Sequence, residues 1–161
     1  MRAAVSAGIL LFRRRGPALE VLLAHPGGPF WAGRDAGAWT IPKGLAEEDE
    51  ALAAVAMREF AEETGFEIAS VATTPGAPPI PLGEIALKSG KIVHGWAVEG
   101  DLDPSLAQSN EATIEWPPRS GRELIIPEVD RVAWFSPAEA RRRIHPAQAA
   151  FVDRLEMHLD S

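Results

Sequence analysis

The chain has 161 residues, of which 46% are hydrophobic and 24% charged, and these proportions fit one globular domain with a single core. It carries 23 acidic against 16 basic residues, and the net charge of −7 argues against a polynucleotide or an anionic membrane surface as a partner. The absence of cysteine excludes disulfides, zinc–thiolate sites and a cysteine nucleophile, and it fits a cytoplasmic protein. No apolar run approaches the roughly 18 residues of a membrane span.

The first quarter of the chain predicts strands separated by turns. The expected elements are strands over 3–13, 19–25 and 38–41, with a turn at Gly16-Pro17 and a Gly/Pro-rich loop over 25–33. The continuous apolar run of the first strand predicts burial on both faces. Phe30 and Trp31 lie on the loop, where they either stack on a nucleobase or pack the loop against the protein.

A helical period follows, and it predicts a helix that begins after Asp49 as N-cap, runs to about Thr64 and stops at Gly65. The spacing of small and apolar side chains predicts a core-facing stripe that consists of Ala53, Ala56, Met57, Phe60, Ala61 and Thr64.

Three carboxylates, Glu59, Glu62 and Glu63, are spaced i, i+3 and i+4, which brings them to one face of this helix. Like charges at these spacings repel one another unless a cation lies among them. Mg²⁺ takes oxygen ligands, usually a few carboxylates with water and substrate phosphate. The residues therefore predict a helix-borne Mg²⁺ site that acts on a phosphate ester or anhydride, and the alternative is a solvated acidic helix face.

The rest of the chain predicts a strand, a hairpin and two helices. These are a strand over 67–73, a hairpin of 82–88 and 91–98 around Ser89-Gly90, a short helix from Pro137 with Ser136 as N-cap, and a terminal helix over 146–158 anchored by Phe151, Leu155 and Met157. The Pro-rich stretch 74–79 is a connection within one domain, and Asp103-Pro104 predicts a turn or helix start instead of a second metal site.

The segment 105–129 is the most distinctive outside the carboxylate helix. Its run Trp116-Pro117-Pro118-Arg119-Ser120-Gly121-Arg122 combines an aromatic ring, two cations and a rigid turn. Such a loop can grip a base and phosphates together, which favours Trp116 and Arg119 as substrate contacts. The alternative is a strand–turn–strand unit whose arginines face solvent.

The stretch from Gly44 to Phe66 resembles the Nudix box: Gly, five residues, Glu, seven residues, Arg-Glu, an aliphatic, any residue, Glu-Glu, any residue, Gly, an aliphatic. Every charged and glycine position of that pattern is filled, by Gly44, Glu50, Arg58, Glu59, Glu62, Glu63 and Gly65. The departures are Phe60 and Phe66, at packing positions. The preceding run, Trp39 to Gly44, resembles the same loop of dinucleoside polyphosphate hydrolases in the family, although Leu45 stands where those often carry His.

This resemblance implies one Nudix hydrolase domain over 1–161, with an α/β fold in which a mixed β-sheet is sandwiched between α-helices. It implies metal-dependent hydrolysis of the pyrophosphate bond in nucleoside diphosphates linked to another group: dinucleoside polyphosphates, nucleoside triphosphates, ADP-ribose or nucleotide sugars. The cofactor would be Mg²⁺, with Mn²⁺ as an alternative. The other hypotheses are a non-catalytic nucleotide-binding Nudix sensor module and an RNA-end processor, which the acidic balance disfavours. The protein is expected to be a monomer or homodimer.

The resemblance also implies roles for single residues. Glu59, Glu62 and Glu63 would bind metal, and one of Glu62, Glu63 or Glu128 would be the catalytic base, with Asp130 and Glu115 as alternatives to Glu128. Arg58 and Glu50 would orient the carboxylates, between the glycines at 44 and 65. The Lys43 carbonyl would help to hold metal, and its ammonium group can meet substrate phosphate.

Overall fold

The strand β1 (Val5–Arg15) is central to the sheet in the computed structural model, which describes residues 4–161. The other strands of this sheet are β2 (Ala18–Pro26), β3 (Lys43–Leu45), β4 (Ile80–Ala86), β5 (Ile92–Glu99) and β8 (Val129–Phe135). Their order is β4-β5-β1-β2-β8, and β3 also pairs with β1. Because β1 runs parallel to β5 and antiparallel to β2 and β3, the sheet is mixed.

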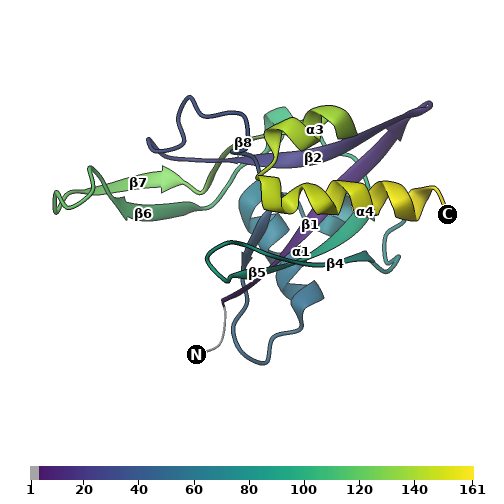
Figure 1. Cartoon of the computed structure of the whole chain (residues 1–161), viewed down its shortest axis with the longest axis horizontal. Coiled ribbons are helices and arrows are strands. Elements are labelled where there is room, and N and C mark those ends of the chain that lie inside the picture. The colour runs from purple at the N-terminus through teal and green to yellow at the C-terminus, as the bar shows by residue number, and fades with distance from the viewer. Residues whose placement is uncertain (1–3) are drawn as a thin grey trace.

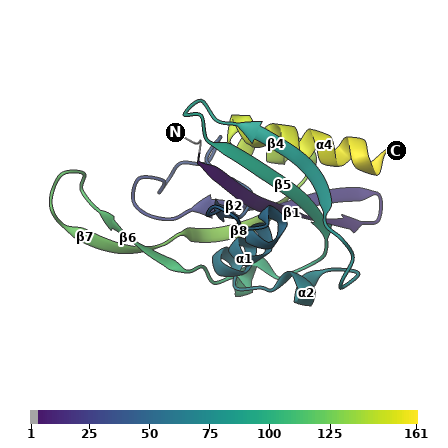
Figure 2. The same cartoon turned by 90° about the horizontal axis from the view of Figure 1, so that it is seen from below.

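Helices cover both faces of this sheet (Figure 1). They are α1 (Leu52–Thr64), α2 (Ile68–Val71), α3 (Pro137–Arg143) and α4 (Ala149–Leu159), with 3₁₀ turns at Pro104–Leu106 and Pro146–Gln148. In Figure 2 the sheet lies between α4 on one side and α1 on the other, which confirms the expected α/β sandwich. Over residues 4–161, no helix combines the length and the apolar character that crossing a membrane requires.

The apolar run of β1 is buried on both faces, as the sequence predicts. Ile9 and Leu11 belong to the core under α1, whereas Leu10 and Phe12 belong to the core under α4. This alternation follows from the two-residue period of a strand. The strands that pair with β1 are therefore attached to a strand that is fixed on both sides.

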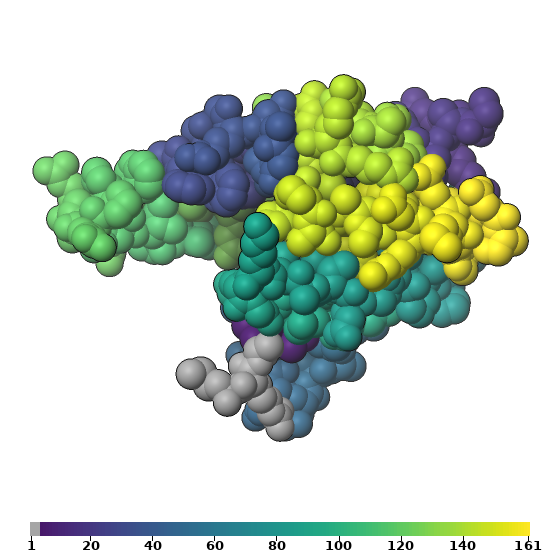
Figure 3. Space-filling view, viewed as in Figure 1, coloured from purple at the N-terminus to yellow at the C-terminus, as the bar shows by residue number. Residues whose placement is uncertain are grey.

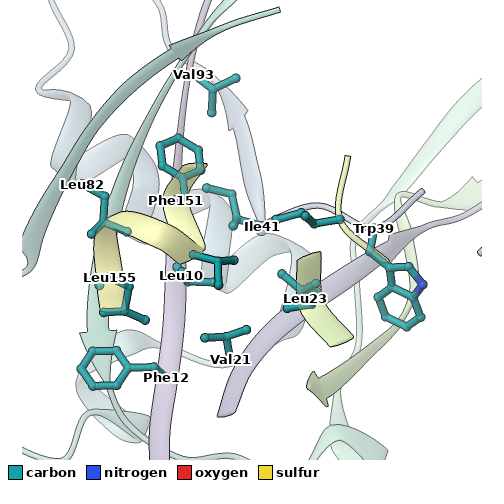
Figure 4. Packing of buried hydrophobic residues seen from close by; sticks show 14 of the residues in the cluster. Leu10, Phe12, Val21, Leu23, Trp39, Ile41, Leu82, Val93, Phe151 and Leu155 are labelled. Atoms are coloured by element: carbon teal, nitrogen blue, oxygen red, sulfur yellow. The ribbon is translucent and has the colours of Figure 1, made fainter. Parts of the chain in front are cut away.

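Helix α4 is held to the sheet by Phe151 and Leu155, both fully buried (Figure 4). The Phe151 ring lies over Gly95 of β5, where an added Cβ would come within 2.8 Å of the ring. The expectation that Met157 is a third anchor is wrong, because its side chain is 71% exposed. It follows Leu155 by two residues, which is about 200° around a helix.

The edges of β1 explain where the carboxylate helix lies. β2 pairs with Phe12 to Arg15, at the far end of β1, whereas β3 pairs with Ser6 to Gly8, at its beginning. Both partners lie on the same edge of β1, since β2 diverges there to pair with β8. The segment before α1 therefore fills the place that β2 leaves, and it becomes part of the sheet.

Two expected strands differ in the structure. The stretch 67–73 contains the short helix α2 instead of a strand, because Ile68 and Val71, three residues apart, are buried together under one turn. Residues 38–41 make only isolated bridges, Trp39 to Ile144 and Thr40 to Ala24.

The start of α1 also differs. Asp49 is not the N-cap: it has a φ of 68°, and Ala51 occupies the cap position without a side-chain hydrogen bond. The turn before the helix is held instead by Glu50, whose Oε1 accepts the Glu47 N–H at 2.8 Å. Gly65 does end the helix, with a φ of 79° and its N–H donated to the Ala61 carbonyl at 2.8 Å.

The segment 105–129 contains a separate two-stranded ribbon, β6 (Glu111–Glu115) and β7 (Glu123–Pro127), which the strand–turn–strand alternative predicts. The ribbon projects from the body as a green lobe at the left of Figure 3. Its base is tied to the end of α1, because the Asn110 N–H donates to the Glu62 carbonyl at 2.8 Å. The ribbon therefore begins beside the carboxylates and leads away from them.

Candidate functional site

The carboxylate of Glu59 lies directly over the backbone of Gly44. An added Cβ on Gly44 would fall 2.0 Å from Cδ and 2.2 Å from Oε2 of Glu59. Because Gly44 pairs with Ala7 in the sheet and Glu59 belongs to α1, this contact joins the helix to β3. A glycine is required here by the close approach of a functional side chain.

Glu63 is the most deeply buried carboxylate of the site, with 9% of its surface exposed. Its Oε1 accepts the backbone N–H of Lys43 at 3.2 Å. The pKa of Glu63 is raised to about 8, chiefly by burial; the Lys43 N–H and the Lys43 charge oppose this shift, and the charges of Glu128 and Glu59 add to it. A cation beside this buried carboxyl would strongly stabilise its ionised form.

The pKa of Glu59 is also raised. Burial and then the neighbouring Glu62 raise its pKa, while Arg58 opposes this shift and Glu128 adds to it. Glu62 is exposed at the outer side of α1. The two box carboxylates that face β3 are therefore Glu59 and Glu63, and Glu62 lies at their rim.

Arg58 lies along the carboxylates as the resemblance implies. Its Nη1 donates to Oε2 of Glu50 at 2.5 Å, its Nη2 lies 3.6 Å from Glu59, and its Nε lies 3.9 Å from Glu62. The hydrogen bond from Arg58 is the main cause of the lowered pKa of Glu50. Since one guanidinium group contacts all three side chains, it can fix their orientation.

Glu128, which precedes β8, comes from the far end of the chain to the same place. Its charge raises the pKa of both Glu59 and Glu63, which puts it within electrostatic reach of them. Its backbone is held by Asn110 and by Gly27, which donates to the Glu128 carbonyl at 3.0 Å. The fold thus brings the charge of Glu128 close enough to act on carboxylates that lie more than 60 residues earlier in the chain.

The two alternatives to Glu128 have other partners. Asp130 lies 2.9 Å from Nδ1 of His25. Glu115 accepts backbone N–H groups of Arg119 at 2.8 Å and Gly121 at 3.2 Å, within the turn of the ribbon. Both carboxylates therefore have partners outside the box, and their part in catalysis stays a prediction.

A divalent cation fits the donors of this site. Within residues 4–161, no three carboxylate or histidine side chains converge into a preformed metal cage. Mg²⁺ does not need one, because it keeps several waters and is commonly bound by one or two carboxylates together with substrate phosphates. The donors present are all oxygens, and Glu63 is buried with a raised pKa. This is the set that a hard divalent ion prefers.

Lys43 is half-buried beside these carboxylates and forms no ion pair with any residue from 4 to 161. Burial lowers the pKa of its ammonium group; Glu63 opposes that shift, and the nearby charge of Lys91 adds to it. The Lys43 side chain lies on the sheet face where Gly8 has no Cβ, since an added one would lie 2.7 Å from Lys43 Cβ. Its contact with substrate phosphate stays a prediction.

The proposed aromatic contacts do not gather at the carboxylates. Trp31 packs against the core under α4, and its ring makes an edge contact with Phe30 at 4.9 Å, as the packing alternative predicts. Trp116 and Arg119 lie at the turn of the ribbon, which points away from α1 in Figures 1 and 2. Their contact with substrate stays a prediction.

A cavity lies in another part of the protein. It has a volume of about 590 Å³ and is bounded by α2, the 72–80 segment and the end of α4. None of the box carboxylates lines it. This cavity is therefore separate from the arrangement around Glu59 and Glu63.

His25 is a buried residue near the site that the sequence did not single out. Its Nε2 lies 2.6 Å from the Arg34 carbonyl and its Nδ1 lies 2.9 Å from Asp130, so it ties the loop after β2 to β8. In the sequence, His25 is seen only as a histidine at the end of a predicted strand, before Pro26 and Gly27. This pattern is too common to predict that the histidine has a role.

Comparisons with known proteins agree with the resemblance seen in the sequence. A family model described as NUDIX domain matches residues 2–155. A C. elegans Ap4A hydrolase in a binary complex is similar with a TM-score of 0.64 and 18% identity, over 96% of this chain and 98% of that one. The NUDIX domain of Shewanella oneidensis NrtR, complexed with ADP ribose, gives 0.65 and 17%, over 99% and 90%.

A further similar structure is a Nudix hydrolase from M. smegmatis, RenU, with a TM-score of 0.55 and 21% identity, over 99% of this chain and 89% of that one. At these identities the likeness shows the fold alone. No curated protein matches the chain.

Proposed function

The chain belongs to the NUDIX domain family and is a pyrophosphohydrolase of the Nudix type, and from this premise we propose that it uses a divalent cation to cleave nucleoside diphosphates linked to a second group. Mg²⁺ is the first choice of cation and Mn²⁺ the second. The observation that carries the proposal is the buried Glu63, with its raised pKa, beside Glu59 and within reach of Glu128.

Each residue has a role that its position allows. Glu59, Glu63 and the Lys43 carbonyl would hold the cation, with Glu62 at the rim; when bound, the cation neutralises phosphate charge and lowers the pKa of water. Glu128 is our choice for the base that takes the proton of the attacking water, with Glu62 or Glu63 as alternatives. The Lys43 ammonium group would meet phosphate oxygens.

Two substrate classes come first. The run from Trp39 to Gly44 favours dinucleoside polyphosphates, and the C. elegans structure is of an Ap4A hydrolase. The NrtR structure contains ADP ribose, so ADP-ribose is the second substrate class that we propose. Nucleoside triphosphates and nucleotide sugars follow. The net charge of −7 favours a small nucleotide over a polynucleotide, and the absence of cysteine fits action in the cytoplasm.

The test is a hydrolysis panel of diadenosine polyphosphates, nucleoside triphosphates, ADP-ribose, UDP-sugars and capped RNA, with Mg²⁺ and with Mn²⁺. We expect at least one small nucleotide to be cleared with kcat/KM of roughly 10⁴ M⁻¹s⁻¹ or more. Glu63→Gln is expected to keep the fold and to lower turnover by orders of magnitude. The matched control is Glu47→Gln, an exposed carboxylate just inside the same box.

Two outcomes would contradict the proposal. An unchanged rate in Glu63→Gln would remove the metal-site assignment. Binding of nucleotides without turnover on any member of the panel would favour the non-catalytic sensor.

A further inference from the structure

One face of the ribbon formed by β6 and β7 is apolar. It carries Ala112, Ile114, Leu124 and Ile126, because directly paired residues share a face and every second residue returns to it. At the base of the ribbon Gly28 lies against this face, since an added Cβ would come within 2.8 Å of the Ile126 side chain. Leu124 lies farther out and is 40% exposed. A two-stranded ribbon that projects in this way (Figure 3) is marginally stable by itself, and further strands would stabilise it.

The hydrogen bonds of the ribbon fix which backbone groups of β7 point outward. At the turn, Trp116 N–H donates to the Arg122 carbonyl at 2.9 Å. At the base, Glu128 N–H donates to the Asn110 carbonyl at 2.9 Å. Because an antiparallel pair forms these bonds at every second residue, the even-numbered residues of β7 bond to β6, and the N–H and C=O of Ile125 point the other way. No strand within residues 4–161 pairs with that outer edge.

The outer edge of β7 also lacks the protection that another edge strand of this protein has. β4 is the last strand of the main sheet, and Nη1 of Arg154 donates to its Leu82 and Glu84 carbonyls, both at 2.9 Å. Such a charged cover keeps an edge strand from pairing with another chain. Ile125 is 66% exposed, and the sequence of β7, Glu-Leu-Ile-Ile-Pro, suits a strand. The edge of β7 is therefore available to a further strand.

Charge distinguishes the two edges of the ribbon as contact sites for a second copy of the chain. The residues of β6 whose backbone groups point outward are Glu111, Thr113 and Glu115. Two β6 strands paired antiparallel about Thr113 would set Glu111 of each copy opposite Glu115 of the other. Like charges directly opposite each other destabilise a strand pair, so the edge of β6 disfavours a second copy.

The edge of β7 does not have this conflict. Its base end is closed, because Pro127 has no N–H and its carbonyl lies against Gly27, where an added Cβ would be 2.0 Å away. Two β7 strands therefore pair about Leu124, which sets Glu123 of each copy opposite Ile125 of the other. No like charges are then directly opposed, and the apolar faces of both ribbons lie on the same side of the sheet.

We propose that two copies of the chain associate through β7 and form an antiparallel four-stranded sheet in the order β6-β7-β7-β6. Both copies use the same surface, so the contact closes as a two-fold dimer instead of extending into a filament. Four strands with one apolar face are enough for a stable sheet, whereas one ribbon is not. The interface lies on the ribbon, and the inference does not depend on the proposed function.

The test uses a matched pair of variants, Ile125→Pro and Thr113→Pro. These residues are directly opposed in the ribbon, and the N–H of each points away from the other strand, so proline removes a donor from an outer edge alone. Sedimentation equilibrium measures the dissociation constant of the dimer. Ile125→Pro is expected to raise it roughly 10-fold or more, because a symmetric dimer loses two hydrogen bonds, whereas Thr113→Pro should stay within about twofold of the wild type.

Three results would overturn the inference: a wild type that is monomeric at every concentration, equal effects of the two variants, or assemblies larger than a dimer. Amide hydrogen exchange of the wild type is a second measurement, which needs no variant. The amides of Glu123 and Ile125 should exchange more slowly as the protein concentration rises, whereas those of Thr113 and Glu115 should not respond. Exchange at Glu123 and Ile125 that is independent of concentration also overturns the inference, even if proline disturbs the ribbon.

Discussion

Glu59 occupies the space that a side chain on Gly44 would need, with Cδ 2.0 Å from the position of an added Cβ. Gly44→Ala must therefore displace the Glu59 carboxylate, the flexible end of a side chain. We expect a change of roughly 1 kcal/mol in the free energy of unfolding, an ordinary value for one substitution. Turnover should fall roughly 10²-fold, because a small misplacement of a reacting group has that effect. Thermal unfolding and kcat measure the two effects.

Gly95→Ala is the matched control, because its Cβ would press on the buried Phe151 ring at 2.8 Å. That variant should lose about 1–3 kcal/mol of stability from overpacking while the carboxylates stay in place. A Gly44→Ala enzyme with full activity would mean that Glu59 does not act from the position seen here.

Arg58→Ala should lower turnover by roughly 10- to 100-fold, the usual effect of losing a group that orients metal ligands. Its contacts with Glu50, Glu59 and Glu62 would be lost together. Since the arginine is nearly half-exposed, the melting temperature should change little. The half-saturating Mg²⁺ concentration should rise, and that rise separates an effect on the carboxylates from one on substrate phosphate. An unchanged Mg²⁺ requirement would contradict this role.

Phe151→Ala should cost about 3–5 kcal/mol in the free energy of unfolding, because the ring is fully buried between α4 and the sheet. Met157→Ala on the same helix should stay within about 0.5 kcal/mol, since that side chain is exposed. Urea titration of both variants checks the pair. Equal losses would show that α4 packs through a different face.

Acid should weaken the attachment of the loop after β2. Asp35 accepts hydrogen bonds from Trp39 Nε1 at 2.7 Å and Arg143 Nη1 at 2.5 Å, and these bonds lower its pKa, with Trp39 the larger cause. A lowered carboxyl pKa stabilises the folded state above the unfolded value of about 4, and this contribution is lost as pH falls through the folded value.

The melting temperature of the wild type should therefore fall below about pH 4. Asp35→Asn should be less stable at pH 7 and should lose less on acidification. Glu111→Gln, which removes an exposed carboxylate on the ribbon, should follow the wild-type curve. Parallel curves for Asp35→Asn and the wild type would refute this linkage.

Local signals were sufficient for much of the fold. The spacing from Glu50 to Gly65 gave helix α1 and its end, and Ser89-Gly90 gave the hairpin of β4 and β5. These features depend on neighbours in the chain, which a sequence displays directly. The residues of α2 show the limit, because two of its four side chains, Ile68 and Val71, are β-branched and suit a strand, and only their burial in the core under α1 favours the helix.

The site itself depends on contacts that no local pattern displays. The box pattern named Glu59 and Glu63, but their difference from Glu62 arises from β3, which buries them. The N-cap at Asp49 was wrong because Glu50 is engaged by Arg58 and the Glu47 N–H, which changes the turn.

The insertion of the box segment beside β1 limits what can be moved to another protein. A peptide spanning 44–66 would carry the box carboxylates, but it would lack β1 to hold Gly44 under Glu59 and the distant Glu128. Such a peptide should be partly helical and bind divalent ions weakly. Transplantation therefore requires the whole sheet edge, and a nicked or circularly permuted chain should recover activity only when β1 and β3 reunite.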